Sequence, residues 1–260
     1  MTLPVRVKIC GIQEPRHAVV AAEQDADFVG MVFVRSPRFV IIERGREIAR
    51  TLSEWRRQHP PSVAEGFSTP DNSTERHSGP LAEAARKLDA LLARKRPLVV
   101  GVFADREIHE LRNIVLACGI DVVQLSGDEP WDYCDGFRQP VIKVIKVRPG
   151  QTADAVIQHI EAGAPILGQR GGICIVEPYV RQRYGGTGTA LDWTIAAEVA
   201  ARVPVMLAGG LRPETVGEAV ARVQPWGVDV SSGVETDQVK DEGKIVAFIR
   251  AARAGVTSGS

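Results

Sequence analysis

Residues able to do chemistry stand where short apolar runs of this sequence stop. They comprise a thiol, carboxylates, cations, an amide and a hydroxyl, namely Lys8, Cys10, Arg35, Arg38, Asp105, Gln124, Ser126, Asp128, Lys143, Lys146, Glu177 and Asp229. Thiols and carboxylates transfer protons when burial or neighbouring charges shift their pKa values. The set indicates an acid–base site if the fold brings the ends of the runs together. Taken alone, Cys10 also fits a small buried hydrophobic residue.

Two loops rich in glycine and serine follow the last two apolar runs. Gly209 and Gly210 end one run, and Ser231, Ser232 and Gly233 end the next. Exposed backbone N–H groups near a helix start bind anions, and glycine lets the backbone approach the anion's oxygens. A pair of tight turns is the alternative. Two such loops on neighbouring strands of a barrel favour a phosphate site.

Eight apolar runs, each followed by a helical pattern, must position these residues. The runs cover residues 5–10, 27–34, 97–104, 121–127, 141–147, 172–177, 203–210 and 227–233. Several are almost continuously apolar, which predicts parallel strands buried on both faces. Eight such units predict an α/β protein, a single (β/α)8 TIM barrel over residues 1–255 with its site at the carboxyl ends of the strands. An open α/β sheet is the alternative, but no GxGxxG follows the first run.

An insertion over residues 58–96 interrupts this alternation between the second helix and the third strand. Residues 58–79 are rich in Pro, Ser, Thr and charge, which predicts a flexible loop, and residues 80–95 have helical spacing. We expect the insertion to lie away from the site, because a loop after a helix leads to the amino end of the next strand. Asp105 and Gly119 are expected to cap the helix between them, and residues 256–260 to form a frayed tail.

Composition narrows the class of protein. The 260 residues include 32 basic and 32 acidic ones, and this balance argues against nucleic-acid binding. No apolar run approaches the ~20 residues of a membrane span. Residues 1–15 lack the apolar core of a signal peptide, which predicts a cytoplasmic protein. The four cysteines form no CxxC pair, so neither a zinc site nor disulfides are expected. We expect a monomer, with a homodimer as the alternative.

The sequence resembles the phosphoribosylanthranilate isomerase family. The matching motifs are VKICGI at 7–12, SPR at 36–38, GVF at 101–103, VQLSGDE at 123–129, GGTGTALDW at 185–193, LAGGLRPETV at 207–216 and GVDVSSGVE at 227–235. The glycine motifs alone occur in several phosphosugar barrels, whereas KICGI together with DVSSGVE is more specific. The resemblance implies an Amadori rearrangement in tryptophan biosynthesis. A small phosphosugar would be the substrate, with no cofactor and no metal.

The resemblance also implies an acid–base pair. Cys10 matches the family's general base, which removes the C2 proton after the ribose ring opens to a Schiff base. A thiol base needs a lowered pKa. Lys8 lies two residues earlier on the same side of the strand and would favour the thiolate at close range. Glu177 stands where the family has the aspartate that protonates the ring oxygen, a role that requires a pKa raised by burial.

Other residues match the family's substrate contacts. Arg38 matches the arginine that binds the anthranilate carboxylate, a task suited to the guanidinium fork. Asp229 matches an aspartate near the ribose hydroxyls, with Lys8 and Ser126 expected beside the substrate. The positions that match phosphate-contacting backbone are Gly210, Ser232 and Gly233, next to Gly209 and Ser231.

Two positions depart from the family pattern. Glu177 replaces an aspartate, and a misplacement of a catalytic group by about 1 Å can reduce the rate strongly. Ser126 replaces a common histidine, which bears on substrate specificity more than on reaction class. These departures keep two alternatives open, a related phosphosugar-barrel enzyme with an altered substrate and a non-catalytic paralogue that binds a phosphorylated ligand.

Overall fold

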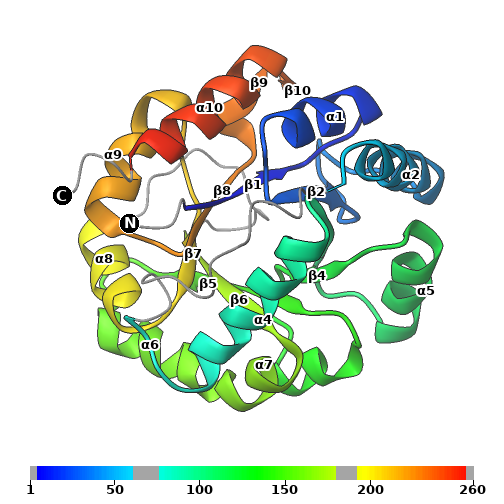
Figure 1. The fold of residues 1–260 in the computed structure, drawn as a ribbon. Coiled ribbons are helices and arrows are strands. Elements are labelled where there is room, and N and C mark those ends of the chain that lie inside the picture. Colours follow the sequence, from blue (N-terminus) through cyan, green and yellow to red (C-terminus); the bar gives the residue numbers. More distant parts are fainter. Residues whose placement is uncertain (1–4, 61–75, 180–191, 256–260) are drawn as a thin grey trace.

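The computed structural model describes residues 5–60, 76–179 and 192–255 and contains a closed barrel of eight parallel strands (Figure 1). The strands are β1 (Arg6–Cys10), β2 (Phe28–Val32), β3 (Leu98–Phe103), β4 (Val122–Leu125), β5 (Val141–Val147), β6 (Gly172–Pro178), β7 (Val205–Leu207) and β8 (Gly227–Val230). The predicted (β/α)8 architecture is confirmed. Residues 61–75 of the expected loop, most of the 185–193 motif and the expected tail at 256–260 lie outside the described residues.

Helices surround the barrel (Figure 1). They are α1 (Pro15–Glu23), α2 (Ile42–Gln58), α5 (Ile108–Cys118), α6 (Ala153–Ala162), α7 (Ala164–Arg170), α8 (Trp193–Arg202), α9 (Pro213–Val223) and α10 (Glu242–Ala254). β4 is followed only by the 3-10 helix η1 (Trp131–Gly136). α7 was not predicted, and it starts where Gly163 ends α6 and a proline occupies its first turn. Among the described helices, none has the length and apolar character needed to cross a membrane.

The remaining helix, α4 (Pro80–Arg94), lies across one end of the barrel (Figure 1). Leu88 and Leu92 are buried in the same apolar cluster as residues that fill the barrel interior. Asp89 accepts a hydrogen bond of 2.8 Å from Nε of Arg6, the first residue of β1, and one of 3.4 Å from Nε1 of Trp226, just before β8. These partners belong to the amino ends of their strands. α4 therefore closes the amino end and leaves the carboxyl end for a site.

The expected N-cap at Asp105 is wrong. α5 begins at Ile108 with Glu107 as its N-cap residue. Asp105 has a φ of +48°, and its Oδ1 accepts a hydrogen bond of 2.8 Å from the backbone N–H of Asp128. Its carboxylate thus joins the loops after β3 and β4 instead of capping a helix. Gly119 ends α5 in the left-handed conformation with a φ of +60°, as expected.

Candidate active site

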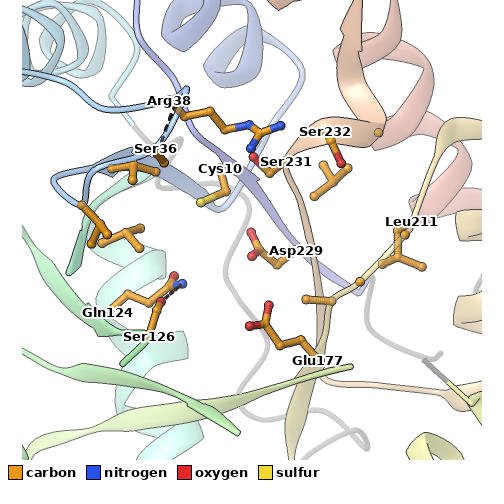
Figure 2. A pocket seen from close by; sticks show the side chains of 18 residues that line it. Cys10, Ser36, Arg38, Gln124, Ser126, Glu177, Leu211, Asp229, Ser231 and Ser232 are labelled. Atoms are coloured by element: carbon orange, nitrogen blue, oxygen red, sulfur yellow. Dashed lines mark hydrogen bonds between the residues drawn. The ribbon is translucent and has the colours of Figure 1, made fainter. Parts of the chain in front are cut away.

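A cavity opens at the carboxyl ends of the strands, with an empty volume of about 760 Å³ that includes its mouth. Figure 2 shows Asp229 between Cys10 and Glu177 in this cavity. The predicted site residues that line it are Cys10, Arg38, Ser126, Glu177, Gly209, Gly210, Asp229, Ser231, Ser232 and Gly233. The fold therefore brings together ten predicted positions from six segments of the barrel.

Lys8, the remaining predicted site residue, lies buried beneath the cavity and does not line it. The parallel register of β1 and β8 sets Lys8 opposite Asp229, and Nζ donates a hydrogen bond of 2.8 Å to Asp229 Oδ1. Burial is the strongest single influence and lowers the pKa of Lys8, but the charges of Asp229 and Cys10 and the hydrogen bonds to both together outweigh it, so the pKa lies above its ordinary value. Lys8 is thus a buried cation that holds Asp229. A direct substrate contact by Lys8 stays a prediction.

Cys10 ends β1 opposite Gly30 of β2. A Cβ atom at Gly30 would lie 3.0 Å from the Cys10 Sγ and 3.3 Å from the Lys8 Nζ, so thiol and ammonium meet at this glycine. Burial raises the pKa of Cys10 above its ordinary 9.0, and the charge of Lys8 opposes this only in part. Lys8 favours the thiolate, as expected. The pKa of Cys10 is nevertheless raised and not lowered as expected, because burial has the larger effect.

Glu177 lies near the end of β6, partly buried and opposite Lys146 of β5. Burial and then the negative charge of Asp229 raise its pKa to about 7, while the cations Lys146 and Lys8 oppose the rise. A carboxyl group with this pKa is about half protonated at pH 7, compared with well under 1% for an ordinary glutamate. Glu177 can therefore donate a proton near neutral pH.

Arg38 follows β2 and reaches the cavity past Gly11. Gly11 has a φ of +76°, and a Cβ atom there would lie 2.6 Å from Arg38 Cδ. Glycine is thus needed both for the turn that ends β1 and for the space that Arg38 occupies. The guanidinium donates two hydrogen bonds of 2.7 Å each to Glu235, and these raise the pKa of Arg38. Sequence reasoning did not single out Glu235, although it ends the GVDVSSGVE motif.

Gln124 is a cavity residue that sequence reasoning placed at a strand end but did not assign to the site. Its Nε2 donates a hydrogen bond of 3.1 Å to Ser126 Oγ, and both side chains are buried (Figure 2). Its Oε1 has no hydrogen-bond partner among the described residues. A buried acceptor of this kind suits a ligand donor. The two-residue spacing, which places both side chains on one face of β4, was the signal available.

The two glycine- and serine-rich loops lie against each other. A Cβ atom at Gly233 would lie 1.9 Å from the backbone oxygen of Leu211, so only glycine permits this approach of the β8 loop to the β7 loop. Gly209 and Gly210 have φ values of +98° and +68°. The two loops, the second of which contains Ser231 and Ser232, form one wall of the cavity (Figure 2). Within the described ranges, no three His, Cys, Asp or Glu side chains gather as a metal site would require.

The fold and the cavity define a barrel enzyme with a thiol, a protonatable carboxyl group and a guanidinium around one pocket. Residues 64–251 match the family described as N-(5'phosphoribosyl)anthranilate (PRA) isomerase. The chain is 38% identical over 245 residues to the N-(5'-phosphoribosyl)anthranilate isomerase of Dehalococcoides mccartyi, covering 94% of each chain. It is 39% identical over 250 residues to that of Roseiflexus castenholzii, covering 95% of this chain and 98% of the relative. The protein belongs to the PRA isomerase family.

Solved structures agree with this assignment. Monomers of the dimeric phosphoribosylanthranilate isomerase of Thermotoga maritima superpose with a TM-score of 0.66 at 25% identity, covering 95% of this chain and 98% of that one. A phosphoribosylanthranilate isomerase in complex with reduced 1-(o-carboxyphenylamino)-1-deoxyribulose 5-phosphate gives a TM-score of 0.62 at 27% identity, with the same coverage.

Proposed function

We propose that this protein catalyses the Amadori rearrangement of N-(5'-phosphoribosyl)anthranilate to 1-(2-carboxyphenylamino)-1-deoxyribulose 5-phosphate in tryptophan biosynthesis. Membership of the PRA isomerase family supports the substrate and the reaction. The observation that carries the proposal is the convergence of Cys10, Glu177 and Arg38 on one cavity. This set supplies a base, an acid and a carboxylate-binding cation, which are the groups that the rearrangement needs.

In the proposed mechanism, Glu177 acts first as the general acid. Its carboxyl group donates a proton to the ribose ring oxygen, the bond between that oxygen and C1 breaks, and a protonated Schiff base forms between C1 and nitrogen. The Cys10 thiolate then removes the proton from C2. The released electron pair forms the C1–C2 double bond of the enolamine and neutralises the nitrogen. Protonation at C1 and loss of the hydroxyl proton at C2 give the ketone.

Both ends of the substrate are anionic, and a different part of the cavity would bind each of them. Arg38 would bind the anthranilate carboxylate, since its guanidinium offers paired donors. The loops at Gly209 and Gly210 and at Ser232 and Gly233 would bind the phosphate, and Asp229 would accept hydrogen bonds from ribose hydroxyls. We propose a monomer, whereas the Thermotoga maritima relative is dimeric. Light scattering of the purified protein distinguishes these two states.

The proposal is tested by the loss of phosphoribosylanthranilate fluorescence with purified protein. The wild-type protein should consume the substrate, and Cys10→Ala should lower kcat by about 10²–10⁴-fold, the contribution of a positioned base. Cys118→Ala is the matched control, because Cys118 is a buried thiol on α5 that does not line the cavity. A folded wild-type protein without turnover would overturn the proposed function.

A further inference from the structure

Arg38 is held from outside the cavity by a carboxylate that the proposed mechanism does not use. Its Nε and Nη2 each donate a hydrogen bond of 2.7 Å to separate oxygens of Glu235. The side chains of Arg38 and Glu235 are 13% and 6% exposed. A bidentate pair in a site this dry fixes both the position and the plane of the guanidinium.

A small hairpin that follows β8 delivers Glu235. β9 (Glu235–Thr236) pairs with β10 (Val239–Lys240), and Glu235 lies directly opposite Lys240. The two residues between the strands, Asp237 and Gln238, have φ values of +51° and +65°. Positive φ at both central residues is the requirement of a type I′ turn, which suits a two-residue hairpin. The hairpin therefore sets the register that places a carboxylate and an ammonium side by side.

Lys240 completes a buried group of three charges. Its Nζ contacts Oε1 of Glu235 and donates a hydrogen bond of 2.9 Å to the backbone oxygen of Ser231, a residue of the cavity wall. Burial acts to raise the pKa of Glu235, but the hydrogen bonds from Arg38 and the charge of Lys240 outweigh it, so the pKa lies below its ordinary value. Glu235 is thus ionised at neutral pH. Arg38 and Lys240 then share one carboxylate, and burial lowers the pKa of Lys240 although the charge of Glu235 opposes this.

The guanidinium of Arg38 keeps a second edge of N–H donors for a ligand. Of its five N–H donors, Glu235 takes one on Nε and one on Nη2. Within the described part of the chain, Nη1 donates no hydrogen bond, and Arg38 lines the cavity. The edge formed by Nη1 and the second N–H of Nη2 has the spacing that a carboxylate accepts.

We propose that Glu235 and Lys240 are positioning residues that hold Arg38 with this second edge turned to the carboxylate of the substrate, so that recognition of the anthranilate group depends on the β9–β10 hairpin. The inference rests on the proposed function. It assigns to Glu235 an indirect role, because its side chain contacts Arg38 and not the cavity.

The test is Glu235→Gln, which keeps the size of the side chain and removes its charge and one acceptor. We expect KM for phosphoribosylanthranilate to rise about 10- to 100-fold, as loss of a charged hydrogen bond produces, with kcat changed less than about threefold. With N-(5-phosphoribosyl)aniline, which lacks the carboxylate, wild type and variant should have the same KM within about twofold. In an Arg38→Ala background, Glu235→Gln should have no further effect on KM.

Asp89→Asn is the matched control, because Asp89 pairs with Arg6 at 2.8 Å at the opposite end of the barrel. It should leave KM unchanged, and thermal unfolding shows that each variant is folded at the assay temperature. An unchanged or lower KM in Glu235→Gln, or an equal rise with both substrates, would overturn the inference while wild-type turnover upholds the proposed function. Absence of wild-type turnover would overturn both.

Discussion

In the proposed mechanism, the ionisation of Cys10 and Glu177 determines how the rate depends on pH. The proposed mechanism needs a thiolate and a protonated carboxyl group in the same molecule. Burial sets the opposite order of acidity, since the pKa of Glu177 is about 7 and that of Cys10 lies above 9.0. Between these values most molecules carry one proton on Cys10 and none on Glu177. The form that the mechanism needs carries this single proton on Glu177 and leaves Cys10 as a thiolate, and it is the less populated of the two singly protonated forms.

The pKa of Cys10 lies above that of Glu177, so the productive form is less populated than the other singly protonated form. The minor form follows the pH dependence of the whole singly protonated population. We therefore expect kcat/KM, which reports the free enzyme, to rise with pH up to about 7 and then to level off. It should fall only at a higher pH, where Cys10 also loses its proton.

The assay is kcat/KM against pH for wild type and Glu177→Gln. The rate of the variant should go on rising across pH 7 without levelling off, because it then follows only the thiolate of Cys10. The variant should retain about 1% or less of the maximal wild-type value, because the positioned acid is gone. The substrate phosphate titrates at about pH 6 with both proteins, so the difference between their pH profiles identifies Glu177. Glu177→Asp should keep the levelling off. A wild-type rate that instead falls through pH 7 would refute the reasoning.

Two further predictions concern backbone and packing. Gly11→Ala should raise KM and lower stability by about 1–3 kcal/mol, because its φ is +76° and the new Cβ meets Arg38. Gly79→Ala is the control: Gly79 has a φ of +84° but open space around it, so this variant should lower stability without changing KM. Steady-state kinetics and denaturant unfolding measure the two effects. Leu88→Ala should cost about 2–5 kcal/mol and lower Tm, since Leu88 is fully buried where α4 closes the barrel, whereas Leu116→Ala at an exposed position should leave Tm within experimental error.

Much of the site could be predicted because parallel strands of a barrel all end at the same face. Cys10, Glu177 and Asp229 are far apart in the chain, yet each ends an apolar run, and the fold gathers such positions. Glu235 and Lys240 escaped prediction for a physical reason. The role proposed for Glu235 comes from its contact with Arg38, 197 residues away, and Lys240 acts through its contact with Glu235. Local pattern does not encode a contact between residues so far apart.

The sequence also did not reveal how strongly burial shifts the pKa values of the site. Lys8 next to Cys10 suggested a lowered pKa for the thiol, but desolvation in the closed barrel outweighs the neighbouring charge. Asp105 failed as an N-cap because the loop after β4 offers its carboxylate a backbone donor, Asp128 N–H, that only tertiary structure brings near. Local propensity places the elements well and is least reliable where distant segments compete for the same polar group.

The most direct test of the account is a crystal structure of this protein with reduced 1-(o-carboxyphenylamino)-1-deoxyribulose 5-phosphate. We expect the ligand's carboxylate on Arg38 and its phosphate on the loops at Gly210 and Ser232, with C2 beside the Sγ atom of Cys10 and the carboxyl group of Glu177 within hydrogen-bonding distance of the open-chain oxygen on C4. A ligand bound in the reverse orientation, or with C2 away from Cys10, would contradict the assignment of base and acid.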